Sequence, residues 1–339
     1  MVELDEVAAR AAHTATTLPS GAVFVAGGCI IDGCGTATAD TFLLEPDGAT
    51  AVRGPSMSGP RDGHTATLVG AGVVLAGGFS GEGAGALNSV EIFDQATQAI
   101  RRLHPLAQAR GGHAAAPLPD GRVLVVGGWI ASHTYTLTTE VIDPAAGTIT
   151  AAPNAPVAAD ALDAVALADG RVLVTGGQFR PAEATAAAEI YDPTTNTWTD
   201  LPPMATPRLK HLSVLLGDGR VLIIGGTTDD EHLLATTEVF DPATNTFSTG
   251  PDLTEGRYKM TGGAVALSGN RVLIGGVGRS VELVDVDAGT SRVVLPLGVG
   301  RGSFTTINAW GPNAFIVLGG YDDRITLRRS FEVLTSDEL

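Results

Sequence analysis

The sequence predicts an all-β protein built from repeated four-stranded units, and three observations carry that prediction. The string DGRVLVVGG at 120–128 returns as DGRVLVTGG at 169–177 and as DGRVLIIGG at 218–226. Gly-Gly pairs recur along the chain, at residues 27–28, 77–78, 127–128, 176–177, 225–226, 275–276 and 319–320. The composition includes 44 glycines, 44% hydrophobic residues and 17% charged residues, which is typical of a folded chain with a large core and many tight turns.

The third unit shows how each strand is expected to form. The turn at Asp120-Gly121 separates the first two strands, because Asp-Gly adopts positive φ at low cost. The second strand is apolar at every position, which indicates burial on both faces. The pair Gly127-Gly128 ends it where backbones must approach closely, and Pro144 ends the third strand. The predicted strands are residues 113–118, 122–126, 138–144 and 148–152.

The fixed period predicts that the units stack around an axis. One unit cannot bury both of its faces, whereas a closed ring of units does so and protects the strand edges. Seven Gly-Gly pairs therefore predict a seven-bladed β-propeller with four antiparallel strands per blade, occupying residues 1–339 as a single domain. We expect residues 2–8, as an N-terminal strand, to complete the last blade and lock the ring. The blades are expected to open near residues 10, 61, 110, 159, 208, 257 and 301.

These features resemble the kelch-repeat β-propellers. The resemblance rests on the Gly-Gly pairs and on the segments EVIDP, EIYDP and EVFDP, with the aromatic residues Trp198 and Phe247 following the last two. The three segments begin at Glu140, Glu189 and Glu238. No Trp-Asp dipeptide pattern is present that would favour a WD40 propeller. The resemblance implies that the loop after Gly-Gly and the loop before each first strand share one face, around the mouth of a central channel.

Charge and composition disfavour several kinds of partner and location. The net charge is −16, and Lys210 and Lys259 are the only lysines, so neither a nucleic acid nor an anionic membrane is an expected partner. No apolar run approaches the ~18 residues of a spanning helix, and the opening residues MVELDEVAAR lack the segments of a secretory signal. We therefore expect a cytoplasmic protein with Cys29 and Cys34 as reduced thiols. A lone C-x4-C pair needs further ligands to hold zinc.

The first candidate series is an arginine that opens nearly every blade, mostly as R-x-x-H. Guanidinium groups around a channel mouth would attract carboxylates or phosphates. The histidines give two further possibilities: His64 and His113 as proton carriers, or His13, His64 and His113 sharing a metal ion. The alternative is that both series are scaffold, with each histidine bonded to backbone within its blade. The arginines are Arg10, Arg61, Arg110, Arg208, Arg257 and Arg301, and Ala159 replaces arginine in blade 4.

The second series is the set of residues just after each Gly-Gly pair, which varies where the scaffold does not. Aromatic side chains at such surface positions suit an apolar or aromatic ligand. The alternative is that they plug the channel or pack on a neighbouring blade. The candidates for ligand binding are Phe79, Trp129, Phe179 and Tyr321.

A third set of candidates lies where the repeat breaks. Blade 6 carries Tyr258 and Lys259 within the motif, and these could supply an acid, a base or an anion contact. Blade 4 carries Asp160 and Asp163 on either side of Leu162, which replaces the histidine. Departures from local regularity tend to mark function or strain. The alternative is drift in a degenerate repeat.

These series predict two classes of function. In the first, the chain binds a small anionic or aromatic molecule at the channel mouth and acts as a non-redox enzyme, such as an isomerase, lyase or cyclase, with His64, His113, Tyr258 or Lys259 moving protons. In the second, the rim grips an acidic peptide of a partner protein. A closed, aromatic-lined cavity favours the first class, and a flat rim favours the second. Copper radical oxidases resemble this scaffold but use a further β domain, so that activity is disfavoured. The sequence indicates no cofactor beyond the divalent metal considered for the histidines.

Overall fold

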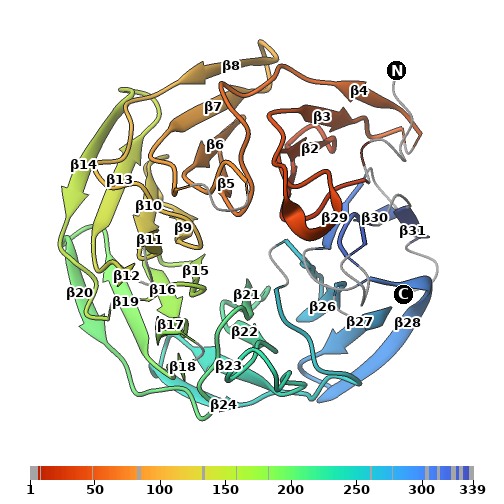
Figure 1. Ribbon diagram of the computed structural model, residues 1–339. Helices are drawn as coiled ribbons and strands as arrows, with labels where there is room; N and C mark the ends of the chain where they lie inside the picture. The colour runs from red at the N-terminus through yellow and green to blue at the C-terminus, as the bar shows by residue number, and fades with distance from the viewer. Residues whose placement is uncertain are drawn as a thin grey trace.

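The computed structural model is a ring of seven β-sheets around a central axis, as the repeat predicts (Figure 1). Six of the sheets have four described antiparallel strands, and the seventh has three. The structure describes residues 7, 9–47, 49–81, 85–131, 134–157, 159–181, 183–259, 262–276, 278–301, 305–310, 314–321, 326–327 and 331–335. Within these residues, no helix is long and apolar enough to cross a membrane.

The strands follow one another outward from the axis in each blade, so that β5, β9, β15 and β21 lie innermost in Figure 1. Blades 1 and 2 are β1 (Thr14–Thr17), β2 (Val23–Ala26), β3 (Thr41–Leu44), β4 (Ala51–Arg53), then β5 (Thr65–Val69), β6 (Gly72–Ala76), β7 (Val90–Asp94) and β8 (Ala99–Arg102). Blade 3 is β9 (Ala114–Pro117), β10 (Val123–Val126), β13 (Thr139–Asp143) and β14 (Thr148–Ala152). Its four strands match those predicted from the sequence.

The remaining blades repeat this order. Blade 4 is β15 (Asp163–Ala166), β16 (Val172–Thr175), β19 (Ala188–Asp192) and β20 (Thr197–Asp200); blade 5 is β21 (Leu212–Leu215), β22 (Val221–Ile224), β23 (Thr237–Asp241) and β24 (Thr246–Thr249). Blade 6 is β25 (Ala264–Leu267), β26 (Arg271–Ile274), β27 (Gly278–Asp285) and β28 (Thr290–Arg301); blade 7 is β29 (Thr306–Ala309), β30 (Ala314–Leu318) and β31 (Phe331–Thr335). Two short hairpins, β11 (Trp129–Ala131) with β12 (Thr134–Tyr135) and β17 (Gln178–Arg180) with β18 (Glu183–Ala184), were not predicted.

The second strand of each blade is largely apolar, with Thr175 and Arg271 as its polar exceptions, because its two faces pack on two different neighbours. In β10, Val123 and Val125 belong to the core shared with blade 2, whereas Leu124 and Val126 belong to the core shared with blade 4. A cluster of this kind lies at every junction, including that of blades 7 and 1. The core is therefore a ring of seven interfaces, and the hydrophobic effect holds the blades together.

The Gly-Gly pairs set the spacing between blades. A Cβ on Gly77 would lie 2.5 Å from the Arg110 carbonyl oxygen and 2.7 Å from His113 Cε1, both in the next blade. Gly78, at φ 93°, donates its N–H to that same carbonyl at 2.9 Å. The second glycine of five other pairs makes the equivalent bond, with Gly320 donating to Arg10 and so joining the last blade to the first. A side chain larger than hydrogen would push the blades apart.

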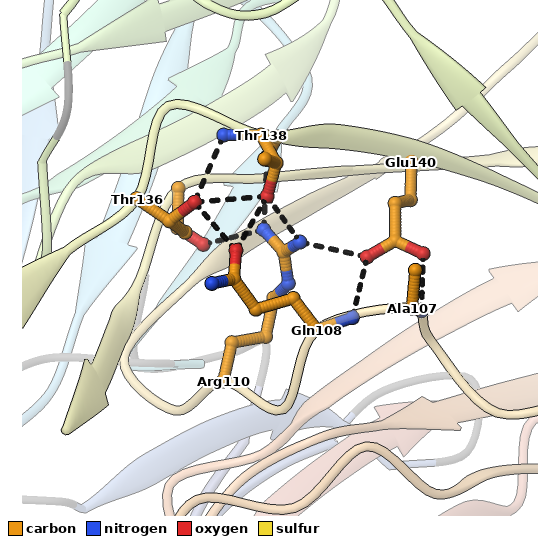
Figure 2. Close-up of polar contacts among 7 residues, drawn as sticks. Ala107, Gln108, Arg110, Thr136, Thr138 and Glu140 are labelled. Atoms are coloured by element: carbon orange, nitrogen blue, oxygen red, sulfur yellow. Dashed lines mark hydrogen bonds and ion pairs between the residues drawn. The ribbon is translucent and has the colours of Figure 1, made fainter.

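The buried arginines hold the chain segment that leads into each blade. Arg110 donates to the Glu140 carboxylate and to the carbonyl oxygens of Gly127 and Thr138, at 2.7 to 2.9 Å (Figure 2). Glu140 also accepts the Ala107 backbone N–H at 2.7 Å. Equivalent ion pairs at 2.6 to 2.8 Å join Arg61 to Glu91, Arg208 to Glu238 and Arg257 to Glu282.

Blades 1 and 4 depart from this pattern. In blade 1, Arg10 lies 4.7 Å from the centre of the Phe42 ring, which stands where other blades have glutamate. In blade 4, Ala159 replaces the arginine while Glu189 is kept, 5% exposed. Among the described residues Glu189 Oε1 has no hydrogen-bond partner, and burial, with the nearby Asp200, raises the pKa of Glu189 to about 7.

The closing strand expected at residues 2–8 falls, apart from Val7, outside the described residues. Val7 is buried in the cluster that joins blades 7 and 1. The same junction is crossed by hydrogen bonds from Thr17 Oγ1 to the Ala309 carbonyl and from Trp310 Nε1 to the Glu45 carbonyl, at 3.0 and 2.6 Å. These contacts close the ring.

The two kinds of glutamate should respond oppositely to loss of charge. Glu189→Gln is expected to raise the free energy of unfolding by about 2 kcal/mol at pH 8 and to leave it unchanged at pH 4, because the folded protein keeps this proton up to about pH 7 while the unfolded chain releases it near its ordinary pKa. Glu140→Gln should lower it by roughly 3 kcal/mol, because Arg110 would be left buried without its partner. Urea unfolding of both variants checks the pair, and equal destabilisation would contradict the account of blade 4.

Candidate functional site

A cavity of about 900 Å³ lies on the axis of the ring. It is open because the innermost strands of blades 1 to 3 carry small side chains where they face it: Thr14, Ala15, Thr16, Thr65, Ala66, Thr67, Ala114 and Ala115. Larger or charged side chains, Asp163 and Leu212, line it in blades 4 and 5. The volume falls in the range of small-molecule sites in proteins.

A collar of left-handed residues surrounds the mouth of this cavity. The third residue of each R-x-x-H segment adopts positive φ, and in several blades its N–H donates to the carbonyl of the preceding collar residue at 2.9 to 3.1 Å. Glycine or alanine would be expected there, yet blades 5 and 6 place Lys210 and Lys259 in this conformation, at φ 55° and 50°. Left-handed backbone costs a non-glycine residue roughly 1–2 kcal/mol. The collar residues are Ala12, Gly63, Gly112, Ala161, Lys210 and Lys259, and all of them line the cavity.

Both lysine ammonium groups therefore lie along the same part of the cavity mouth, in blades 5 and 6. Lys210 Nζ lies 2.5 Å from Asp230 Oδ1, with 23% of the lysine side chain exposed. Lys259 Nζ lies 4.9 Å from the centre of the Tyr258 ring. Tyr258 itself does not line the cavity, and its ring instead supports the ammonium group through a cation–π contact.

Three aspartates line the same cavity, in blades 2 and 4. Burial raises the pKa of Asp62 and of Asp160 to about 6, and that of Asp163 to about 7. Asp160 Oδ2 accepts a hydrogen bond from Gln178 Nε2 at 3.2 Å, and Asp163 accepts one from the Ser213 backbone at 2.5 Å. These carboxyl groups can exchange protons near neutral pH. Asp62 was not among the sequence candidates. Blades 1 and 3 carry a small residue directly after the motif arginine, whereas blade 2 carries Asp62 after Arg61, and this difference could have identified it.

Two of the four predicted aromatic residues meet at the mouth. The Phe79 and Trp129 ring centres are 5.3 Å apart with a 58° tilt, and both line the cavity. Gly111 allows this, because a Cβ there would lie 2.2 Å from Phe79 Cζ. Tyr321 is 6% exposed and packs against Ala11 and Leu327. Phe179 is 40% exposed on β17 and does not line the cavity.

The arginine series is placed differently from the prediction that guanidinium groups ring the mouth. Arg10, Arg61, Arg110, Arg208 and Arg257 are at most 2% exposed, and none of the described arginines lines the cavity. Their side chains donate hydrogen bonds to carbonyls and carboxylates within the blades, so they organise the loops instead of binding an external anion. The Arg301 backbone ends β28, and its side chain lies outside the described residues.

The motif histidines bridge neighbouring blades. His13, His64, His113 and His211 each share a hydrogen bond of 2.8 to 3.2 Å between Nε2 and a threonine hydroxyl of the preceding blade, rather than with backbone in their own blade. Burial, reinforced by the nearby arginine, lowers the pKa of His13, His113 and His211 to about 3. These rings are neutral at pH 7. Proton transfer by His64 and His113 stays a prediction, and His13, His64 and His113 do not form a three-ligand metal group.

The two cysteines are joined in a disulfide, with Cα atoms 4.9 Å apart, whereas the sequence led us to expect reduced thiols. The 3-10 turn Asp32–Cys34 returns the chain onto the residue after Gly27-Gly28. Cys34 lines the cavity and Cys29 is fully buried. This pairing lies within one loop, so it fixes the shape of the rim in blade 1.

Comparison with known proteins supports the repeat assignment. Residues 164–205 and 208–254, in blades 4 and 5, match the family model described as the kelch motif. A solved structure described as "Structure of YjhT" superposes with a TM-score of 0.66 at 15% sequence identity, over 84% of this chain and 97% of that chain. At that identity the likeness concerns the fold alone. No curated protein matches the chain at a significant level.

The structural role of the histidines has a measurable signature. His113→Gln should lower the free energy of unfolding by about 1–3 kcal/mol at pH 7.5, since a buried hydrogen bond between blades is disturbed. The unfolded chain binds a proton at His113 below pH 6.5, whereas the folded protein does so only near pH 3. The difference in the free energy of unfolding between wild type and variant should therefore be about 2 kcal/mol smaller at pH 5 than at pH 7.5. Denaturant unfolding at both pH values measures it, and a constant difference would show that His113 titrates in the folded state.

Proposed function

The chain is a kelch-repeat β-propeller, and we propose that it binds a small organic anion with a flat apolar part in its central cavity. The fold is that of a ligand- or protein-binding module, and the cavity favours a small ligand over a flat peptide surface. One observation carries the proposal. Both lysines of the chain and the Phe79–Trp129 pair converge on the mouth of one cavity of about 900 Å³.

The anionic group of the ligand would lie against blades 5 and 6. The protein has a net charge of −16, so an anion is repelled by most of the surface and needs a local cationic arc. Lys210 and Lys259 supply that arc from consecutive collar positions, in place of the arginines suggested by the sequence. Their strained backbone is kept although smaller residues occupy the slot elsewhere, which supports a functional role.

The apolar part of the ligand would pack on Phe79 and Trp129, which belong to blades 2 and 3 and so lie across the channel from the lysines. Tilted rings of this kind offer an apolar face at low entropic cost. The alanine and threonine side chains of the inner strands leave room beneath them. A ligand about as long as the channel is wide would contact both walls at once.

The same site supports non-redox proton transfer. Asp160 lines the cavity, and the charge of Lys210 acts on it. Burial, followed by the charge of Asp160, raises the pKa of the Tyr135 hydroxyl. A carboxyl group near its pKa can serve as the base of an isomerase or lyase, whereas Tyr135 is not among the residues that line the cavity. In this reading Lys259 holds substrate charge, and Tyr258 positions Lys259.

A second candidate function rests on the rim outside the cavity. Several large apolar side chains in the loops that follow Gly-Gly pairs are exposed by 38 to 53%: Ile30, Ile31, Leu137, Phe179 and Leu233. Exposed apolar groups on one face favour contact with a partner protein. A peptide would then cross the rim and leave the cavity unused.

Binding of an aromatic anion separates the two sites. Anilinonaphthalene sulfonate should bind the folded protein with one site per chain, and Lys259→Ala or Trp129→Ala should each weaken binding by about tenfold or more, since a charged or aromatic contact is lost. Titration calorimetry gives affinity and stoichiometry. Phe179→Ala and Arg180→Ala are matched controls, because both side chains lie outside the cavity lining.

The pattern of losses decides between the readings. Loss in the cavity variants alone supports the proposed site. Loss in Phe179→Ala alone, with full binding by Trp129→Ala and Lys259→Ala, would move the site to the rim. Native mass spectrometry of protein purified from its own host would then show a bound polypeptide rather than a compound of a few hundred daltons.

Anion affinity should also depend on pH. Asp160 takes up a proton near pH 6, which removes a negative charge close to Lys210, so the probe should bind about fivefold more tightly at pH 5 than at pH 7.5. The sulfonate of the probe keeps its charge over this range. Asp160→Asn should bind more tightly at pH 7.5 and show a weaker pH dependence. An unchanged profile in that variant would exclude Asp160 from the site.

A further inference from the structure

A second cluster of chemically reactive groups lies at the mouth, apart from the lysines. Cys29, Cys34 and Asp62 each offer one ligand atom, and these three atoms all lie within 4.8 Å of one another. It is the one grouping of three such side chains found in the part of the chain that the structure describes. Cys29 and Cys34 come from blade 1 and Asp62 from blade 2, so the cluster spans a junction between blades.

The repeat itself brings these residues together. Gly28 donates its N–H to the Arg61 carbonyl at 2.8 Å, which sets Cys29 beside the next residue of blade 2, Asp62. Backbone hydrogen bonds with Ala11, at 2.7 and 3.1 Å, hold Cys29 in place, and Asp62 is paired with Phe79 in the same way at 2.9 Å. The positions of the two side chains are therefore built by the scaffold.

The third side chain is positioned by the loop. Cys34 ends the turn Asp32–Cys34 and adopts φ 63°, a conformation that a non-glycine residue rarely takes. Its N–H donates to the Ile31 carbonyl at 3.1 Å. Asp32 Oδ1 accepts the Leu327 N–H at 2.8 Å, which ties this loop to blade 7. Strained, well-held backbone of this kind is common at ligand sites.

Asp62 points to a missing partner. The residue is 9% exposed, and its Oδ2 has no hydrogen-bond partner among the described residues. A buried carboxylate oxygen without a donor costs free energy, and a cation would remove that cost. The preceding arginine does not fill this role in the described structure: Arg61 directs Nη1 and Nη2 to Gly77, Ser89 and Glu91.

We propose that Cys29, Cys34 and Asp62 form a binding site for zinc, or a similar thiophilic divalent ion, when the Cys29–Cys34 disulfide is reduced. Two thiolates and one carboxylate are zinc ligands, and three protein ligands leave a fourth position open. Cys34 and Asp62 line the cavity, so the open position faces it. The inference goes beyond the proposed anion site and does not depend on it, since the lysines occupy blades 5 and 6.

The conversion needs a two-electron reductant, and with a phosphine also one water molecule, which supplies the two protons and the oxygen of the phosphine oxide. A dithiol or phosphine reductant supplies two electrons, the S–S bond breaks, and two protons complete the two thiols while the reductant is oxidised. Metal binding then displaces those two protons, because zinc binds the thiolate form. An added disulfide oxidant would reverse the step: it accepts two electrons from the two thiolates, the Cys29–Cys34 bond reforms, and the ion is released. The site is thus open to metal only under reducing conditions.

Cobalt(II) is the probe, because thiolate ligation gives it a near-ultraviolet charge-transfer band. Protein reduced with a phosphine under argon should bind one cobalt ion per chain with that band, and zinc should displace it. The unreduced protein should show no band. Cys34→Ser should abolish the band, and Asp62→Asn should weaken cobalt affinity at least about tenfold. Asp163→Asn, a buried cavity aspartate outside the cluster, should bind as wild type does.

Circular dichroism establishes that each variant is folded before titration. Three results would overturn the proposal: no thiolate band in the reduced wild type, cobalt bound without the band, which indicates histidine ligation, or wild-type affinity in Asp62→Asn, which removes the carboxylate from the site. Because the readout is metal ligation, failure here leaves the anion site unaffected. Loss of anion binding in Lys259→Ala, equally, leaves this site unaffected.

Discussion

The close approach of consecutive blades at the Gly-Gly pairs is the constraint on which the rest of the structure depends. In six of the seven pairs the second glycine donates to a carbonyl of the next blade, and in five pairs a Cβ on the first glycine would lie 2.3 to 2.6 Å from a carbonyl oxygen of that blade. That spacing brings the apolar second strands within packing distance on both sides. It also returns the last blade to the first, through Gly320 and Arg10. Hydrophobic burial drives the packing of the blades, and the glycines set the distance at which they pack.

Once the spacing is set, the repeated arginines and histidines make contacts that hold the blades together. The repeated arginines are buried on carbonyls and glutamates, and the repeated histidines are neutral bridges to threonine. Their repetition indicates a structural role, because a residue that recurs from junction to junction makes a contact that the ring needs. Blade 4 shows the effect of a missing arginine. Ala159 stands in its place, and the pKa of Glu189 is raised.

The proposed sites use positions that the scaffold holds in place without specifying their side chains. Two such positions meet across junctions that the structure describes: the residue after Gly-Gly, and the residue after the arginine of the next blade. Phe79 packs over Gly111 in this way, Tyr321 over Ala11, and Cys29 beside Asp62. The collar residue that follows is a third position of this kind, and blades 5 and 6 fill it with lysine. One geometry thus accounts for the positions of both the proposed anion site and the proposed metal site, in different blades around one mouth.

The sequence by itself determined the number of blades, the order of strands and the face on which the variable residues gather. The number of blades and the order of strands follow from local turn chemistry and a repeat of about 50 residues, whereas the common face was implied by the resemblance to kelch propellers. Trp129, Phe79 and Lys259 were identified because they interrupt a regular pattern. Whether Arg110 or His113 faces the channel, and that Asp62 lies beside Cys29, were decided only by the tertiary structure. The reason is physical: burial, pKa and ligand geometry depend on atoms brought together from different blades, and no local pattern encodes those distances.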